Sequence, residues 1–260
     1  MNYNYHTHTY LCSHATGTVE EYIEKAIAGG IKFMGFSDHI PHIDKNGTEE
    51  FYRVPCSKAE EYVNKISDMR EKYKNEIELS IGFESEYYPD AFDDMLSRAI
   101  SVGAEYLILG AHFLAEASAY TMMPTDSVDF LKEYVLNVTT AIKSGVFTYV
   151  AHPDILRFTG DDFAYCEQMR KICKASYEYN VPLEINFLGI RDRRNYPNEN
   201  FWQIAGEEKS PVTFGFDAHT AEDACDLNSK DKAEEIVKKY NLNYIGKPEL
   251  VKIKKHKVII

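Results

Sequence analysis

Short runs of apolar and β-branched residues alternate along the chain with longer segments of helical periodicity. This alternation predicts βαβ units and a parallel sheet. A short eighth strand piece is expected near Asn243 to Ile245. The seven main expected strands are Tyr3 to His6, Phe33 to Ser37, Leu79 to Glu84, Tyr106 to Gly110, Thr148 to Ala151, Pro182 to Asn186 and Val212 to Phe216.

Several helix boundaries can be predicted from local signals between these strands. Thr18-Val-Glu-Glu21 and Ser57-Lys-Ala-Glu60 have the pattern of capping boxes, in which a hydroxyl and a carboxylate bond the free N–H groups of a helix start. The first helix is expected to end at Gly29-Gly30, where a residue without a Cβ can adopt a left-handed conformation. Another helix is expected from Asp126 to Lys143, ending near Gly145.

The expected fold class is α/β. Seven strands alternating with helices favour a closed or nearly closed (β/α) barrel, with its site at the C-terminal ends of the strands. An open doubly wound sheet is the alternative, and periodicity alone does not separate the two. No linker, repeat or low-complexity tract divides the chain, so residues 1–260 are expected to form one domain.

Composition narrows the partners of the chain. Forty-one acidic and 29 basic residues give a formal net charge of −12, which argues against nucleic acid or an anionic membrane as partner. No leader-like segment and no long apolar run are evident, so a cytoplasmic location is expected. Five scattered cysteines without a C-x-x-C pair argue against disulfides and against a thiolate zinc site. Oligomeric state stays open.

Histidines and carboxylates fall where the expected strands end. In a parallel barrel these ends converge on one face, so the side chains are expected to lie together. Eight of the nine histidines lie in such segments, whereas His256 lies in a basic segment and is expected not to take part. The strand-end residues are His6 and His8, Asp38 and His39, Glu84, His112, His152, and Asp217 with His219, while the sixth strand ends in Asn186.

Imidazole and carboxylate ligands without thiolate suit zinc, iron or manganese, and about nine ligands exceed the capacity of one ion. Two or three divalent metal ions are therefore expected as cofactors. Residues two apart at a strand end point to the same side, which lets His6 and His8 reach one ion. Taken singly, Asp38, Asp217 or Asn186 is equally explained as a turn or cap residue, and one of Glu84 and Glu86 could face solvent; only the joint clustering favours metal binding.

The order and spacing of these motifs resemble those of the polymerase-and-histidinol-phosphatase (PHP) superfamily, and within it the histidinol-phosphatase branch. The H-x-H and D-x-H elements are shared by the superfamily, whereas His42 and the stretch from Asn186 through Gly189, Arg191 and Tyr196-Pro197 indicate the branch. The matching motifs run from His6-Thr-His8 and His14 through Asp38-His39, Gly82-Phe-Glu84, Gly110-Ala-His112 and Ala151-His152-Pro153-Asp154 to Asp217-Ala-His219.

The resemblance implies a distorted (β/α)7 TIM-like barrel that holds three metal sites. The first would take His6, His8, Glu84 and Asp217; the second would take Glu84, His112 and His152; the third would take His14, His39 and His219. Asp38 would sit behind His39 and fix its tautomer.

The implied activity is hydrolysis of L-histidinol phosphate to L-histidinol in histidine biosynthesis. Asp217 belongs to the catalytic metal centre, Arg157 and Arg191 are expected to grip the phosphate, and His42 would bind phosphate or protonate the leaving group. Weaker candidates for contacting the substrate are Glu116 and Asp154. Two alternatives stay open: a PHP phosphoesterase acting on another ester, such as a nucleotide or phosphotyrosine, and a metal-binding protein without catalysis.

Overall fold

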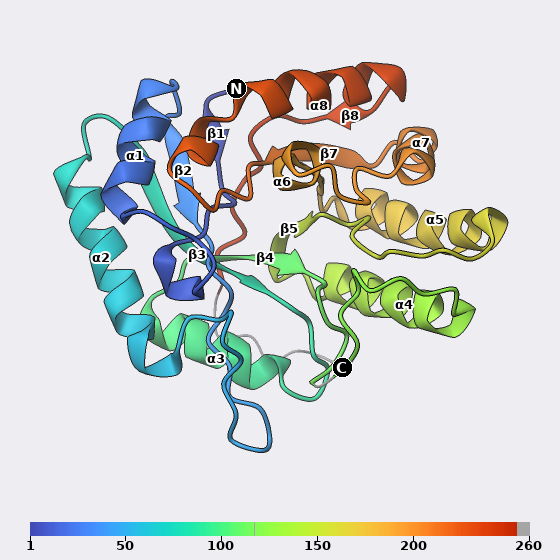
Figure 1. The fold of residues 1–260 in the computed structure, drawn as a ribbon, viewed down its shortest axis with the longest axis horizontal. Helices are drawn as coiled ribbons and strands as arrows, with labels where there is room; N and C mark the ends of the chain where they lie inside the picture. Colours follow the sequence, from blue (N-terminus) through green and yellow to red (C-terminus); the bar gives the residue numbers. More distant parts are fainter. Residues whose placement is uncertain (117, 254–260) are drawn as a thin grey trace.

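The chain folds around a parallel sheet of eight strands that follow one another in sequence order (Figure 1). The computed structural model describes residues 1–116 and 118–253, so His256 lies outside the described part. The strands are β1 (Tyr3–Asn4), β2 (Phe33–Phe36), β3 (Glu78–Ser85), β4 (Tyr106–Gly110), β5 (Phe147–Ala151), β6 (Leu183–Asn186), β7 (Pro211–Gly215) and β8 (Asn243–Tyr244).

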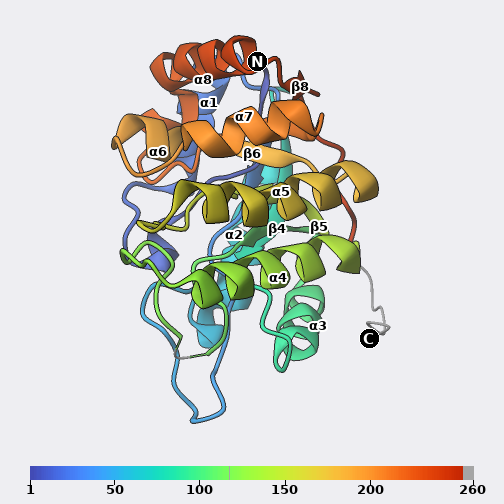
Figure 2. The same ribbon diagram turned by 90° about the vertical axis from the view of Figure 1, so that its right-hand side faces the viewer.

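The helices cover the outside of this sheet, and α5 packs between α4 and α7 (Figure 2). None of the helices in the described ranges is both long and apolar enough to cross a membrane. The longer elements are α1 (Val19–Ala28), α2 (Ala59–Lys72), α3 (Phe92–Val102), α4 (Val128–Ser144), α5 (Asp162–Tyr179), α6 (Phe187–Arg191), α7 (Glu199–Glu207) and α8 (Leu227–Lys239), and the 3-10 turns are η1 (Tyr10–Cys12), η2 (Cys56–Lys58) and η3 (Glu222–Cys225).

The sheet curls into a half-barrel, which confirms the expected TIM-like class. Every neighbouring pair of strands is parallel, and the strand order never reverses, so the doubly wound alternative is excluded. Beyond the strands proper, a parallel bridge joins Thr7, after β1, to Ala218, after β7. The first and seventh strand extensions therefore meet at the C-terminal rim, where the segments that follow the strands face a common space. The short eighth strand is present as expected, and it pairs with β7.

Local signals explain most helix boundaries. The Thr18 capping box is confirmed, because Thr18 and Glu21 each accept a hydrogen bond from the other's backbone N–H. Gly30 adopts a left-handed φ of 82° after α1, as predicted. The second box is wrong: α2 begins at Ala59 after a 3-10 turn, and its cap residue is Lys58, whose side chain makes no capping bond.

A layer of tyrosines fills the barrel near the N-terminal ends of the strands. Tyr3, Tyr5, Tyr106 and Tyr149 are all buried and form a small cluster of their own. The Tyr106 hydroxyl donates to the carbonyl of Tyr5 at 2.9 Å. These rings therefore form an apolar cluster that is separate from the main hydrophobic core.

Candidate metal centre

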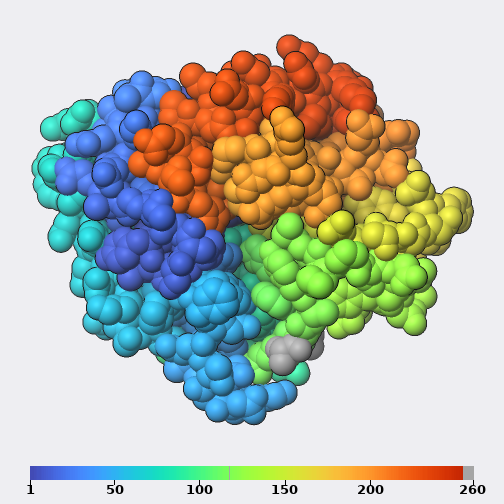
Figure 3. All heavy atoms as spheres, in the orientation of Figure 1, coloured from blue at the N-terminus to red at the C-terminus, as the bar shows by residue number. Residues whose placement is uncertain are grey.

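All nine predicted metal ligands gather at the C-terminal rim. They come from the end of β3 and from the segments that follow β1, β2, β4, β5 and β7, and most of them line one cavity of about 650 Å3. Figure 3 looks at the molecule from the side on which the N-terminal segment, the segment after β4 and the segments after β6 and β7 meet. The convergence that the barrel topology predicted is therefore present.

The Glu84 carboxylate lies at the centre of this cluster. Both of its oxygens are buried, and Oε1 lies 2.9 Å from Nε2 of His152. A Cβ on Gly110 would lie 2.2 Å from the same oxygen, so only glycine leaves room for the carboxylate there. Five imidazoles surround Glu84 with nitrogen-to-oxygen distances of 2.9 to 3.5 Å, namely His6, His8, His39, His112 and His152.

Asp217 provides the second carboxylate. Its Oδ1 lies 3.6 Å from Nε2 of His6 and 3.3 Å from Nε2 of His8. Asp217 has a left-handed φ of 47°, which is uncommon for a residue with a Cβ and concentrates at functional sites. Arg191 holds this backbone, since its Nη2 donates to the carbonyl of Asp217 at 3.2 Å. The sets predicted for the first two ions are thus brought together.

The third predicted set is brought together in part. The rings of His14 and His219 lie 4.8 Å apart. The Nδ1 of His39 instead faces Glu84 at 3.4 Å, and His39 groups with Glu84 and His112. Beside His14 and His219 lies Cys12, a buried thiol that the sequence argument had set aside.

The protonation states suit cation binding. Burial alone would raise the pKa of Glu84, but the surrounding imidazoles, His112 and His6 first among them, hold the pKa well below its ordinary value. Burial lowers the pKa of His39, and it lowers the pKa of His219 to about 3, so both rings are neutral and can ligate a metal. The nearby carboxylates raise the pKa of His6 although burial opposes them, and a bound cation would displace that proton.

Buried nitrogens without a hydrogen-bond partner test whether these residues fit a metal ion. Nε2 of His6 and Nδ1 of His39 make no hydrogen bond to any part of residues 1–116 and 118–253, although both are buried. Buried polar atoms normally have a hydrogen-bond or metal partner, so a bound group that accepts these nitrogen lone pairs is expected beside them. Both nitrogens face Glu84, and the described residues contain several groups of histidines and carboxylates that could hold metal ions.

Two carboxylates that the sequence argument did not single out orient the ligands. Glu184, wholly buried in β6, accepts from Nδ1 of His6 at 2.8 Å, which leaves Nε2 of that ring for a metal. Glu86 pairs with Nδ1 of His112 at 3.1 Å and with the buried Arg53 at 2.8 Å. Both Glu84 and Glu86 are buried, so the solvent-facing interpretation of one of them is wrong.

Asp38 also lies differently from its predicted place. It accepts from the backbone N–H of Thr9 at 2.7 Å, and its Oδ1 is 3.5 Å from Nδ1 of His8. Asp38 therefore supports His8 and the turn after β1 rather than His39. The reason is that the segment after β1 lies beside the segment after β2, where the backbone N–H of Ser37 donates to the carbonyl of Thr7 at 2.8 Å.

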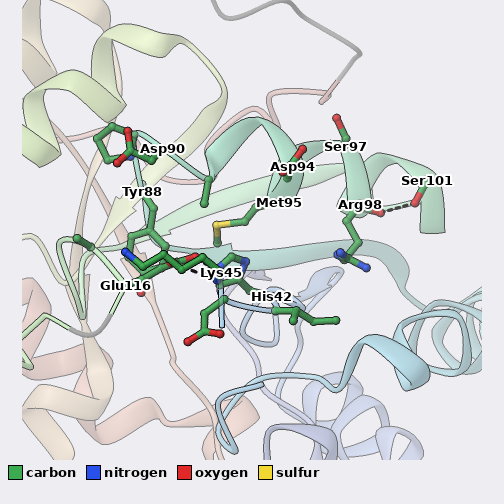
Figure 4. Close-up of a pocket in the computed structure, with 15 residues that line it drawn as sticks. His42, Lys45, Tyr88, Asp90, Asp94, Met95, Ser97, Arg98, Ser101 and Glu116 are labelled. Atoms are coloured by element: carbon green, nitrogen blue, oxygen red, sulfur yellow. Dashed lines mark hydrogen bonds and ion pairs between the residues drawn. The ribbon is translucent and has the colours of Figure 1, made fainter. Parts of the chain in front are cut away.

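His42 and Glu116 do not line the metal cavity. Nε2 of His42 and Oε1 of Glu116 pair at 2.9 Å, and both residues line a second cavity of about 610 Å3 (Figure 4). Lys45, Tyr88 and Arg98 lie on the walls of this second cavity. The predicted contact of His42 and Glu116 with substrate in the metal centre thus has no counterpart in this arrangement.

The other predicted substrate residues serve the scaffold. Asp154 is buried and accepts from Nε1 of Trp202 at 2.9 Å, which ties it to α7. Arg157 is exposed, and its backbone bonds Thr121. Arg191, besides holding Asp217, is engaged by two carboxylates: its Nε lies 3.1 Å from Asp223 and its Nη1 3.0 Å from Asp226.

A different arginine lines the cavity. Arg194, together with Asp192 and Tyr196, forms one wall. The sequence does not indicate that Arg194 lines the cavity, because a run of four consecutive polar residues from Arg191 to Arg194 does not show which of them points inward. Another part of the lining is aromatic: the ring of Phe113 lies 5.8 Å from that of Tyr52 and 5.3 Å from that of Tyr120.

Comparison with known proteins agrees with this geometry. A family model of the PHP domain matches residues 4–187. The chain belongs to the PHP family. It is 25% identical over 254 residues to a histidinol-phosphatase of Bacillus subtilis, covering 84% of this chain and 93% of that protein. It is 24% identical over 228 residues to a probable histidinol-phosphatase of Deinococcus radiodurans, covering 82% and 85%.

A solved structure has the same fold. The histidinol phosphate phosphatase of Lactococcus lactis, crystallised with zinc, L-histidinol and phosphate, superposes with a TM-score of 0.69 at 19% identity, covering 94% of this chain and 95% of that one. At this identity the likeness concerns the fold.

Proposed function

We propose that this PHP-family protein is a metal-dependent phosphatase and that L-histidinol phosphate is its substrate. The observation that carries the proposal is the Glu84 carboxylate among five imidazoles at the mouth of a barrel, next to Asp217. Relatives that match most of this chain and bear the name histidinol-phosphatase support the choice of substrate.

The proposed ligand sets follow the geometry. One ion would be held by His6, His8, Glu84 and Asp217, and a second by His112 and His152 with Glu84 between them. A third would lie near His14, His219 and His39. Zinc, iron or manganese would supply Lewis-acid stabilisation of the phosphoryl group and hydroxide at neutral pH.

The residues of the chain determine how a phosphate ester would sit. Glu184 and Glu86 fix the tautomers of His6 and His112, so that the ligating nitrogens carry lone pairs. Arg194 would bind phosphoryl oxygens in two-point fashion from the rim of the cavity. The cavity volume of about 650 Å3 is within the range of small-molecule sites.

The remaining walls suit the organic part of histidinol phosphate. The stacked rings of Tyr52 and Phe113, with the tilted ring of Tyr120 beside them, offer an apolar surface for an imidazole. Asp192, exposed on the rim of the same cavity, provides a carboxylate for the ammonium group. A phosphorylated tyrosine would also fit against the aromatic wall, so that ester is the second candidate.

The test separates the two candidates. Purified protein is stripped of metal, reloaded with zinc, iron or manganese, and assayed for phosphate release from L-histidinol phosphate and from a peptide that contains phosphotyrosine. The proposal predicts metal-dependent turnover with a higher kcat/KM for L-histidinol phosphate. Asp192→Asn is expected to reduce that preference, because phosphotyrosine in a peptide carries no ammonium group at the corresponding place. Faster turnover of phosphotyrosine would contradict the substrate assignment.

A further inference from the structure

Cys12 lies where the third metal ion of the proposed function would bind. Its Sγ belongs to a group of four potential ligand atoms, the others from His8, His14 and His219, which all lie within 4.8 Å of one another. Among the described residues, Cys12 is the one cysteine in such a group. The thiol is wholly buried, so Cys12 is not a surface cysteine that lies near these histidines by chance.

The local fold sets the position of this thiol. Thr9 begins the 3-10 turn η1: its side chain accepts from the backbone N–H of Leu11, and its carbonyl accepts from that of Cys12 at 3.1 Å. Ser13 follows with a left-handed φ of 64°, which reverses the chain and brings His14 back beside Cys12. The turn thereby holds the sulfur and the His14 imidazole close together, within 4.8 Å of a ligand atom of His219.

The tautomers of both histidines leave the correct nitrogen free. Nδ1 of His14 lies 2.6 Å from the carbonyl of Cys12, and Nδ1 of His219 lies 3.1 Å from the carbonyl of Asp217. A carbonyl oxygen can only accept, so each Nδ1 carries the proton and each Nε2 keeps its lone pair. Two imidazoles prepared in this way beside a thiol form a ligand set of the kind that binds zinc.

A second observation concerns His8. Its Nδ1 is buried and makes no hydrogen bond to the described residues, although Cys12 and Asp38 both lie beside the ring. The other nitrogen of the ring, Nε2, faces Glu84 and Asp217. A cation bound by Cys12 would therefore lie next to the His8 ring, whose other nitrogen is a proposed ligand of the first ion.

We propose that Cys12 binds the third ion as a thiolate, together with Nε2 of His14 and Nε2 of His219. Ligand atoms around a tetrahedral zinc lie about 3.4 to 3.6 Å apart, given Zn–S and Zn–N bonds of about 2.3 and 2.05 Å. From separations of at most 4.8 Å, an inward movement of roughly 1 Å completes the set. Binding releases the thiol proton to solvent, and the sulfur donates its lone pair to the metal. The third site then differs from the other two, whose ligands are only nitrogen and oxygen.

Cobalt(II) spectroscopy of the full-length protein tests this inference. Metal-free protein is titrated with cobalt(II), and bound metal per chain is measured after gel filtration. A thiolate ligand gives a sulfur-to-cobalt charge-transfer band in the near ultraviolet, which nitrogen and oxygen ligands do not give. We expect the band in the wild type and in the matched control Cys166→Ser, a residue of α5 outside the cluster. We expect Cys12→Ser to lose the band and to bind its weakest cobalt at least tenfold less tightly.

Two further measurements guard against an unfolded variant. Cys12→Asp offers a carboxylate of similar size, and it is expected to retain the third ion without the charge-transfer band. In the wild type, saturating zinc is expected to protect Cys12 from alkylation under mild denaturant, as mapped by peptide mass spectrometry, and to leave the rate at Cys166 unchanged. Three bound cobalt ions without a band, a band that persists in Cys12→Ser, or equal alkylation of Cys12 with and without zinc would overturn the inference.

The inference rests on the proposed metal centre, but its failure can be told apart from failure of the proposed function. Cobalt-loaded protein that hydrolyses phosphate esters without a thiolate band keeps the function and refutes the Cys12 ligand. A band in protein that hydrolyses no phosphate ester keeps the Cys12 ligand and refutes the function.

Discussion

Replacing Glu184 with glutamine tests whether a buried carboxylate prepares the metal centre. One oxygen of Glu184 accepts from Nδ1 of His6 at 2.8 Å. The other accepts from the backbone N–H of His152 at 3.0 Å and from the side-chain amide of Asn186 at 2.9 Å. All three partners are thus donors, and only a carboxylate can accept from them all.

Glutamine fails in either orientation. If its amide nitrogen faces His6, that ring must accept at Nδ1, and the proton moves to Nε2, where the metal should bind. If the amide nitrogen faces His152, two donors meet in a buried place, which costs about 1–3 kcal/mol. Loss of such an orienting partner lowers metal affinity about 10- to 100-fold, or about 1.4 to 2.7 kcal/mol.

The assay is competition for zinc between the protein and a chelator of known affinity. Glu184→Gln is compared with wild type and with Glu78→Gln, a matched change at the exposed start of β3. We expect the zinc dissociation constant to rise at least tenfold for Glu184→Gln, with a parallel loss of phosphatase activity at limiting zinc, and to stay unchanged for Glu78→Gln. A dissociation constant within twofold of wild type would refute the reasoning about the His6 tautomer.

Four further changes have defined outcomes. Arg194→Ala should raise KM for the phosphate ester about 10- to 100-fold, because a charged hydrogen bond to the phosphate is lost. The control Arg193→Ala, outside the cavity, should leave steady-state kinetics unchanged. Equal effects of the two substitutions would argue against phosphate binding by Arg194. Gly215→Ala places a Cβ 1.6 Å from Oε1 of Glu184, so chemical unfolding should show a loss of about 1–3 kcal/mol, and an unchanged unfolding midpoint would contradict the packing. Asp226→Ala removes the cap of α8 and should lower the free energy of unfolding by about 1–2 kcal/mol at pH 7. Burial alone would raise the pKa of Asp226, but its hydrogen bonds and ion pair lower the pKa, so this stabilisation is lost as pH falls below about 4. A difference in unfolding free energy between wild type and variant that does not narrow in acid would refute this role. Chelation of bound metal should lower the thermal midpoint, because free zinc at a hundredfold excess over its dissociation constant stabilises by about 2.7 kcal/mol, and re-addition of zinc should restore the midpoint; a midpoint indifferent to metal would contradict a metal-stabilised centre.

The parts of the site that the sequence predicts best are those set by strand ends. His6, His8 and Asp217 follow strands and Glu84 lies at the end of one, and the alternation of strands with helices alone brings such residues together. The expected strand boundaries agree with the structure to within two residues, because apolar runs between turn signals define buried strands well.

Side chains that depend on loop conformation were not predictable in this way. Arg191 and Arg194 lie in the same polar run, and which one enters the cavity is decided by ion pairs of Arg191 with Asp223 and Asp226, two residues far along the chain. Glu184 carried a weak signal, since it is a charged residue in an apolar strand, two positions before Asn186 on the same face. A buried charge without a partner is costly, so such a residue indicates a partner even before that partner is known.

The phosphatase account is tested most directly by inorganic phosphate release from L-histidinol phosphate, measured beside a panel of sugar, nucleotide and tyrosine phosphates with metal-free and zinc-, iron- or manganese-loaded protein. The account predicts no turnover without metal, recovery on reloading, and a kcat/KM for L-histidinol phosphate well above that for every other ester. Full activity of the metal-free protein, or no hydrolysis of any ester by the loaded protein, would contradict it.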